Sequence, residues 1–537
     1  MIRIQNIMIR PWVYLLIVLL GVFLKFYKID YRYFWFDEVE TIIHTSGTNY
    51  NNRLPVNELK KISFYHDLLD LNKQNISIKS QLKGIWNSTN LNPLHYGILV
   101  FWHRIVGDKD IHYRYFNVFI FLLTLPFLFK LSEFLFKSKL AGWIAISLFS
   151  VNPFFQYYTF EARYNILCAF LIIINQYTFL KAINRNNYKW WTGYILSGIC
   201  CWYSSFNLGL IFIGHLIYLL IFERKVFVPY IISSFIILIA YLPWLISIYN
   251  NLNEISASLV WHGSFGNQNL FTLIFAQLYF VAYAFVVINV SSPQMAIFMA
   301  NQLEGNYIQF IANLLVIALL IFSAIYTYKK GKNKVFIFIL LIIILQSLFF
   351  LITDLIRNTG ISLIMRYNIL IIIGFMLFLI FLFKEKFTLG SYTFKVFFFG
   401  IVVLGIISGF YLANNNLINR LNKDMNNALF LSKYDKPLLI SDMNTVYMPG
   451  SVPGILAFTN ACKSDKIDIL LVSPDIQNIS DYFDSNNYSN IFVLHGSQDL
   501  INNLKLQFGE KMDSLEIEDM SNEWQIIFNN KNDVNNK

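Results

Sequence analysis

The chain has 537 residues, of which 56% are hydrophobic, 18% aromatic and only 14% charged. Soluble domains usually carry about a quarter charged residues, so this composition is that of a membrane protein. The formal net charge of +10 does not indicate nucleic-acid binding. The basic residues stand singly or in short clusters between apolar runs, as they do in cytoplasmic membrane loops.

The first apolar run, residues 11–27, follows Arg3 and Arg10 in the manner of a signal peptide. It is about 17 residues long and has no small-x-small cleavage site, so we expect an uncleaved first membrane span.

Apolar stretches long enough to cross about 30 Å of hydrocarbon recur to about residue 414. The predicted spans lie near residues 11–27, 113–131, 139–158, 163–181, 190–205, 207–223, 227–248, 306–328, 334–353, 366–384 and 393–413. Two more apolar helices, near 94–106 and 269–290, are ambiguous. The first contains His95, His103 and Arg104, which suits a helix lying in the membrane interface better than a span.

The positions of the basic residues favour about eleven spans with a cytoplasmic N-terminus. This arrangement places one set of basic residues on the cytoplasmic side, namely Arg3, Arg10, Lys130, Lys137, Lys139, Lys181, Arg185, Lys189, Arg224, Lys225, Lys329, Lys330, Lys332, Lys334, Lys384 and Lys386. Inserting 94–106 as a span would move several of these clusters outside. Thirteen spans, with both ambiguous helices inserted, remain the alternative and would invert the middle of the protein.

The predicted fold is therefore an all-α polytopic membrane domain over residues 1–414, followed by a small external α/β domain over 415–537. The first external loop covers about residues 28–112 and the second about 249–305. The tail is rich in Asn, Asp, Ser and Lys. Its short apolar runs at 437–440, 467–472 and 491–494 predict strands separated by turns and helical segments.

Two adjacent carboxylates, Asp37 and Glu38, follow the aromatic cluster 33–36 just beyond the first span. An acid held against aromatic side chains at the membrane surface is partly desolvated, which suits a general base. The alternative is an aromatic belt followed by solvated acids.

Arginines recur at predicted external membrane boundaries. Arg114 opens the second span, and Arg366 with Tyr367 precedes the tenth, after Asp354 and Arg357. A guanidinium at such a boundary can bind a lipid phosphate, because its fork matches two phosphate oxygens. It can also extend harmlessly to the interface.

Residues 156–164 place Glu161 and Arg163 at membrane depth, at the external end of the third span. Ionisable groups there are costly and usually functional, although a local structural ion pair is an alternative.

Histidines and cysteines indicate less. His44, His66 and Trp261-His262 stand in loops without zinc-site spacing, and the acidic pair could hold a divalent ion only with ligands from elsewhere. We therefore assign no cofactor and no metal. The cysteines predict neither a disulfide scaffold nor a metal site; they are Cys168, Cys200, Cys201 and Cys462.

In this order and on one side of the membrane, these elements resemble the GT-C superfamily of membrane glycosyltransferases. The likeness is nearest to the protein O-mannosyltransferases, the lipid A aminoarabinose transferases and the RgtA/B/C/D-like bacterial group. The matching segments, spread over about residues 10–385, are Phe36-Asp37-Glu38, Asn92-Pro93-Leu94-His95-Tyr96 through Val106-Gly107-Asp108, Tyr113-Arg114-Tyr115-Phe116-Asn117, the run from Gln156 to Tyr164, and Arg366-Tyr367. Asn92-Pro93-Leu94 stands where Pro-Pro-Leu is usual, and residues 113–117 stand where Arg-Leu-Pro is common.

The resemblance implies a sugar donor on a polyprenyl phosphate, undecaprenyl-type, and transfer to a lipid, glycan or protein acceptor outside. Asp37 would then be the general base, with Glu38 beside it and Glu161 orienting acceptor or sugar. The remaining roles implied are donor-phosphate binding for Arg114, Arg163, Arg366 and Tyr367, and substrate binding for His95 and Tyr158.

Two other functions fit the membrane setting. An O-antigen polymerase or ligase would have arginine-rich external loops and no acidic pair after the first span. A transporter or flippase of lipid-linked sugars would show two related halves with broken helices at matching positions, which the sequence does not show. The Asn-, Ile-, Lys- and Phe-rich composition favours a bacterial source, and hence the inner membrane with the site in the periplasm.

Overall fold

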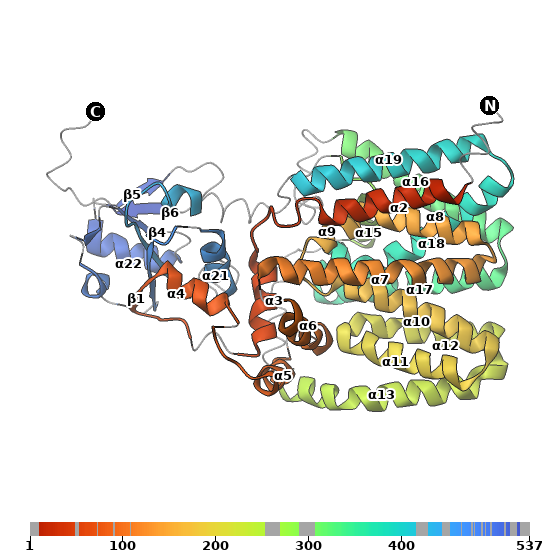
Figure 1. Cartoon of the computed structure of the whole chain (residues 1–537), viewed down its shortest axis with the longest axis horizontal. Coiled ribbons are helices and arrows are strands. Elements are labelled where there is room, and N and C mark those ends of the chain that lie inside the picture. The colour runs from red at the N-terminus through yellow and green to blue at the C-terminus, as the bar shows by residue number, and fades with distance from the viewer. Residues whose placement is uncertain are drawn as a thin grey trace. The chain divides into compact units, whose positions relative to one another are not determined.

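The computed structural model (Figure 1) describes only part of the chain, and all that follows concerns this part. The described residues are 10–48, 53–71, 73–89, 92–107, 109–252, 269–288, 307–414, 428–442, 452–462, 464–473, 476, 478–484, 487–488, 490–493, 497–509, 512–515 and 523–526.

Contacts divide the chain into two compact units. We call the first the helical unit, formed by Met1–Ile29, Trp86–Leu99 and Tyr113–Leu417. We call the second the α/β unit, formed by Asp30–Ile85, Val100–His112 and Ile418–Lys537.

Each predicted span coincides with a helix of the helical unit, except that 139–158 is divided between two helices. The helices are α2 (Pro11–Phe26), α7 (Asp110–Phe136), α8 (Lys139–Val151), α9 (Pro153–Thr159), α10 (Asn165–Arg185), α11 (Tyr188–Ser204), α12 (Leu210–Phe222), α13 (Phe227–Asn250), α15 (Leu270–Tyr283), α16 (Tyr307–Lys330), α17 (Asn333–Arg357), α18 (Ile369–Thr388) and α19 (Tyr392–Asn414). Short 3-10 turns join some of them: η2 (Phe206–Gly209), η3 (Arg224–Val226), η6 (Ile361–Leu363) and η7 (Met365–Asn368). The helix α6 (Pro93–Val106) runs from this unit into the α/β unit.

Seven of the described helices are long and apolar enough to cross a membrane. Shorter apolar helices include α2, α8, the η2–α12 segment and α15. The predicted third span is divided at Asn152, where Pro153 begins α9, because proline fits the first turn of a helix but not its interior. A polytopic helical fold is thus confirmed, while the count of eleven crossings stays a prediction.

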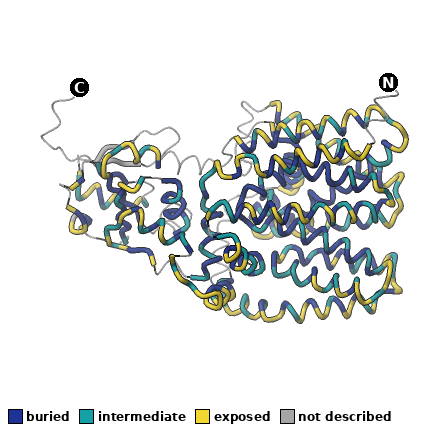
Figure 2. The backbone as a smooth tube through the Cα atoms, viewed as in Figure 1, coloured by how far each residue is buried: buried dark blue, intermediate teal, exposed yellow. Residues whose placement is uncertain are grey.

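The burial of the helices shows how the bundle is layered. In α18, 89% of the apolar window is buried, against 22% for both α13 and α16. Therefore α18 is the central helix, and α13 and α16 face outward. Figure 2 shows the same contrast, with exposed residues along outer helices such as α13.

One end of the helical unit carries the predicted cytoplasmic basic residues. At this end Lys334 Nζ lies 2.6 Å from Glu223 Oε1, joining the start of α17 to the end of α12. At the opposite end, Lys28, just after α2, donates to Asn414, the last residue of α19. The N-terminus is predicted to be cytoplasmic, and α2 is the first span. The C-terminal end of α2 therefore lies at the end of the unit that the sequence predicts to be external.

The α/β unit is built on a mixed sheet with the strand order β1-β3-β2-β4-β6-β5. Its elements are α3 (Phe36–Ser46), β1 (Glu58–Lys61), α4 (Ile62–Leu69), α5 (Ile78–Asn87, which ends in the helical unit), β2 (Leu438–Asp442), α21 (Val452–Ala461), β3 (Asp468–Val472), η8 (Ile479–Tyr482), β4 (Ile491–Val493), α22 (Gln498–Phe508), β5 (Met512–Leu515) and β6 (Glu523–Ile526). The central strands β3, β2 and β4 are parallel, and they are the three strands that the sequence predicts.

A segment from the first predicted loop completes this sheet. The strand β1 pairs antiparallel with β3, with Glu58 opposite Leu471 and Lys61 opposite Asp468. The compact α/β unit therefore includes residues 30–85 and 100–112 as well as the tail, whereas the predicted domain begins at 415. The reason for the difference is non-local strand pairing, which local hydrophobicity does not reveal.

Candidate functional site

The end of α9 and the turn that follows it carry three predicted site residues, Tyr158, Glu161 and Arg163, all buried. Asn117 in α7 holds this turn in place. Its side-chain nitrogen donates to the backbone carbonyl oxygen of Tyr158 at 3.3 Å, and also to that of Glu161. The sequence motif contains Asn117, but its holding role was not predicted.

A second polar tie fixes α9 to the first span. Lys25 Nζ donates to Gln156 Oε1 at 2.6 Å, and Gln156 Nε2 donates to the carbonyl oxygen of Leu24 at 2.6 Å. The Lys25 ammonium also lies 4.9 Å from the ring centroid of Phe121. Lys25 is fully buried, and the sequence pattern does not single it out because a lone lysine near a helix end is ordinary.

Arg114 lies one turn before Asn117 on α7. Its Nη1 donates to the carbonyl oxygen of Ile29 at 2.8 Å, which ties the start of α7 to the end of α2. A guanidinium has five N–H donors, so Arg114 can make several hydrogen bonds at once, and a phosphate oxygen is an acceptor that suits it.

Tyr164 is the centre of a cluster that the motifs did not single out. Its ring lies 6.4 Å from the ring of His95 and 5.7 Å from the guanidinium of Arg163. It also lies within electrostatic reach of Arg366 and Tyr367. The structure thus brings together His95 from α6, Arg163 from the turn, and the Arg366-Tyr367 pair from η7.

The loop that presents Arg366 and Tyr367 is held by buried polar side chains. The Asp354 carboxylate, at the end of α17, accepts hydrogen bonds from Thr359 Oγ1 at 2.7 Å and from the backbone N–H groups of Ile361 and Ser362 at 2.7 and 2.9 Å. Asp354 therefore holds the backbone of this loop in place. The sequence alone did not distinguish this role from that of an ordinary charged residue at a helix end.

Two amides complete the support of this loop. Gln346 Nε2 donates to the carbonyl oxygen of Tyr367 at 2.6 Å. Asn368 Nδ2 donates to the carbonyl oxygen of Ser362 at 2.8 Å, and its Oδ1 accepts from Gln277 Nε2 at 3.0 Å. Backbone outside a regular helix is tolerated at membrane depth only with such internal partners.

Asp37 and Glu38 lie in the α/β unit, in the first turn of α3, and both are buried. Acidic groups there are favoured by the positive end of the helix dipole. The Phe34 N–H donates to Asn460 Oδ1 at 3.2 Å, which anchors the chain before α3 to α21. That Asp37 shares one cavity with the arginines of the helical unit stays a prediction.

The remaining candidates can be placed more briefly. His44 lies 3.9 Å from Glu40 on α3, and His66 Nε2 contacts the carbonyl oxygen of Thr459 at 2.8 Å. Among the described residues, no group of three or more His, Cys, Asp or Glu side chains has a metal-binding arrangement. Asp108, Trp261 and His262 lie outside the described residues.

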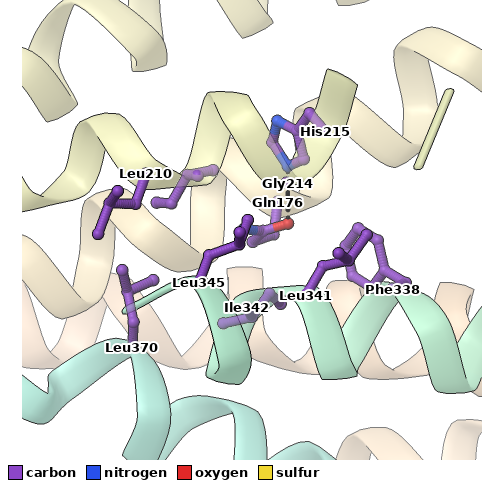
Figure 3. Close-up of a pocket in the computed structure, with 10 residues that line it drawn as sticks. Gln176, Leu210, Gly214, His215, Phe338, Leu341, Ile342, Leu345 and Leu370 are labelled. Atoms are coloured by element: carbon purple, nitrogen blue, oxygen red, sulfur yellow. Dashed lines mark hydrogen bonds between the residues drawn. The ribbon is translucent and has the colours of Figure 1, made fainter. Parts of the chain in front are cut away.

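A separate small pocket lies inside the helical unit (Figure 3). It is lined by Gln176, Leu210, Ile211, Gly214, His215, Phe338, Leu341, Ile342, Leu345 and Leu370. The polar side chains of the lining are His215 and Gln176, which are hydrogen-bonded to each other, with 2.9 Å between His215 Nε2 and Gln176 Oε1. The lining includes none of the predicted site residues, so the pocket is distinct from the Tyr164 cluster.

The fold and this arginine-bearing end are those of a polytopic membrane protein. The family model described as dolichyl-phosphate-mannose-protein mannosyltransferase matches residues 92–247. This stretch contains His95, Arg114, Glu161 and Arg163. A comparison with curated proteins found no significant match.

Two solved structures are similar to the chain. The crystal structure of ArnT from Cupriavidus metallidurans bound to undecaprenyl phosphate shares 10% identity, with a TM-score of 0.52 over 94% of this chain and 96% of that one. The archaeal oligosaccharyltransferase AglB from Archaeoglobus fulgidus, in complex with an inhibitory peptide and a dolichol-phosphate, shares 12% identity over 75% of this chain and 61% of that one. Its TM-score of 0.38 is too low to support an argument. The family match and the ArnT-like fold confirm the GT-C resemblance indicated by the motifs.

Proposed function

We propose that this protein is a glycosyltransferase that moves a sugar from a polyprenyl-phosphate donor to an acceptor on the external face of a bacterial inner membrane. The observation that carries the proposal is the cluster of Arg163, Arg366 and Tyr367 around Tyr164. Fixed cations at one end of a membrane bundle suit a lipid whose phosphate lies at that level. The ArnT structure, similar in fold, is of a protein bound to undecaprenyl phosphate.

In the proposed reaction, the acceptor hydroxyl oxygen attacks the anomeric carbon of the sugar while the bond from that carbon to the phosphate oxygen breaks. The acceptor proton passes to the Asp37 carboxylate, and the polyprenyl phosphate leaves with the bonding electron pair. Fixed guanidinium groups stabilise the charge that develops on the phosphate, a contribution of several kcal/mol. Removal of the acceptor proton by a base adds about 10²–10⁴-fold in rate.

The donor half of the proposal is tested with undecaprenyl phosphate and the full chain in detergent. Replacing Arg163 or Arg366 with alanine removes charge-assisted hydrogen bonds of about 1.5–3 kcal/mol, so we expect binding to weaken at least tenfold. Arg357→Ala is the matched control, because Arg357 is an exposed arginine on the same side of the unit. Equal binding by all three variants, or no binding by the native chain, contradicts the proposal.

The transfer half is tested with Asp37→Asn, with the exposed Asp30→Asn as the control. We expect Asp37→Asn to bind undecaprenyl phosphate normally and to lose the glycosylated product that mass spectrometry finds in cells carrying the native gene. If the protein is a transporter, Asp37→Asn should instead abolish the movement of lipid-linked sugar across the membrane, and no covalent product should be missing in vitro.

A further inference from the structure

The helix α21 in the tail carries two polar side chains in an otherwise apolar sequence, and they behave differently. Thr459 is fully buried, and its hydroxyl donates to the carbonyl oxygen of Leu456 at 3.0 Å, inside the helix itself. Asn460 is half-buried, and its amide bonds outside the helix, to two segments of the first predicted loop. Asn460 therefore joins the tail to that loop.

The two ends of the Asn460 amide hold different segments. Its Oδ1 accepts from the Phe34 backbone N–H at 3.2 Å, and its Nδ2 donates to Asp110 Oδ2 at 2.7 Å. The second bond is to a carboxylate, and such bonds are roughly twice as strong as neutral ones. Turning the amide over would break both bonds, because its oxygen cannot donate and its nitrogen cannot accept. Asn460 consequently fixes the Phe34 backbone relative to Asp110 and to α21.

The Phe34 backbone leads directly into α3, the helix that carries Asp37. The residue at the start of this helix, Trp35, makes no side-chain capping hydrogen bond, although helix N-termini are commonly held by a Ser, Thr, Asp or Asn cap. The Trp35 carbonyl oxygen accepts from the Glu38 N–H at 2.9 Å, which closes the first turn. The position of this turn, and of Asp37 within it, therefore depends on the backbone that Asn460 holds.

Other contacts hold the tail against the same loop. The helix α21 packs against both α3 and α4. His66 Nε2 in α4 lies 2.8 Å from the Thr459 carbonyl oxygen, and β1, which directly precedes α4, pairs with β3 of the tail. All these segments belong to the α/β unit. The tail thus supports the first predicted loop at several points, and Asn460 supplies a support three residues ahead of Asp37.

We propose that Asn460 is a positioning residue for the Asp37 carboxylate. This inference rests on the proposed function, in which that carboxylate takes the proton of the acceptor hydroxyl. A general base must lie within hydrogen-bond reach of the proton that it removes, and a misplacement of about 1 Å can cost about 10²-fold in rate. Asn460 acts through the backbone before α3, so the tail contributes to transfer by keeping Asp37 in place.

Exchange of the donor and the acceptor provides the test. Asn460→Leu removes both hydrogen bonds with little change in side-chain size, whereas Asn460→Asp keeps an acceptor for the Phe34 N–H but sets a second carboxylate against Asp110. The double variant Asn460→Asp/Asp110→Asn restores both bonds, with the donor now at position 110. Asp110→Asn alone measures the cost of changing the other contacts of Asp110. Asn502→Asp, at an exposed position of α22, is the matched control.

Three quantities are measured on the full chain. They are the glycosylated product that mass spectrometry finds in cells carrying the gene, undecaprenyl phosphate binding in detergent, and hydrogen exchange of the first turn of α3. We expect Asn460→Leu and Asn460→Asp to lower product formation by at least about tenfold and to speed this exchange, with lipid binding unchanged. The double variant should recover both properties to the level of Asp110→Asn, and Asn502→Asp should match the native chain.

Several results would overturn the positioning role of Asn460. They are native product formation by Asn460→Leu, a double variant no more active than Asn460→Asp, and lipid binding that falls in parallel with product, which would show a merely structural role. If Asn460→Leu does not accumulate in the membrane, Asn460→Asp and the double variant decide by the same criteria. Asp37→Asn separates the two proposals. If it still forms product, the proposed function fails, whereas loss of product in Asp37→Asn but not in Asn460→Leu refutes only the positioning role.

Discussion

Replacing Asp354 with alanine should disorganise the loop that presents Arg366. Its carboxylate accepts three hydrogen bonds, from the Thr359 hydroxyl and the Ile361 and Ser362 N–H groups. A hydrogen bond to a charged group contributes about 1.5–3 kcal/mol, so three sum to about 5–9 kcal/mol if nothing relaxes. Water entering the loop restores part of this, and we expect a net loss of about 3 kcal/mol, comparable to breaking other buried charged networks.

A series of variants separates loop order from general stability. Asp354→Asn keeps the oxygen that accepts from Thr359 and Ile361 but loses the acceptor for Ser362, so its effect should be intermediate. Asp67→Ala is the control, because its carboxylate is 57% exposed and pairs only at the surface with Lys73, a contact worth about 0–1 kcal/mol.

The assay combines thermal unfolding in detergent with undecaprenyl phosphate binding. Stability and binding should both fall in the order native, Asp354→Asn, Asp354→Ala, with Asp67→Ala close to native. If Asp354→Ala bound the lipid and unfolded like the native chain, the inference that this carboxylate positions the arginine loop would be refuted.

Three further outcomes are expected. Asn117→Ala leaves two buried carbonyl oxygens without this donor and should lower stability by about 1–3 kcal/mol, measured by thermal unfolding together with loss of lipid binding. Gly84→Ala should prevent folding or cost several kcal/mol because its Cβ would overlap the Gly47 backbone, whereas Gly400→Ala in α19 meets nothing within 4 Å and should be neutral or slightly stabilising. Burial lowers the pKa of His103 from its ordinary value of 6.5 to about 4, so the unfolded chain binds the proton more readily. Stability should therefore fall as the pH drops from 6.5 towards 4, by about 2 kcal/mol at pH 5, and His103→Gln should lose this part of the pH dependence in unfolding scans.

The lengths of the hydrophobic runs predicted the helices of the bundle well, because a membrane span requires a continuous run of apolar residues, which is visible in the local sequence. The same reasoning found β2, β3 and β4 as short apolar runs between turns. It missed β1, whose sequence Glu-Leu-Lys-Lys has little hydrophobic character. Lysines are common on edge strands, where they discourage pairing with other chains, and the pairing of β1 with β3 joins residues about 400 positions apart.

The candidate site divides in a similar way. Charged residues at membrane depth, such as Glu161 and Arg163, were recognisable because such groups are rare there. The residues that hold them were not recognisable, since an asparagine or glutamine in an apolar helix carries no sign of its partner. Asn117 and Gln346 act through backbone carbonyls, which are present at every position and leave no pattern in the sequence.

The three side chains around α9 show why polar residues can specify structure inside an apolar bundle. Within hydrocarbon, a polar group without a partner costs several kcal/mol, so each must find one inside the protein. Lys25 and Gln156 satisfy this demand with each other and with the Leu24 carbonyl oxygen, and the amide nitrogen of Asn117 satisfies it with two backbone carbonyls. Apolar side chains would tolerate small rotations of α9, because dispersion contacts have little direction. Directed hydrogen bonds from α2 and α7 do not tolerate such rotations, and they fix the orientation of α9, which carries Tyr158, and of the following turn, which carries Glu161 and Arg163.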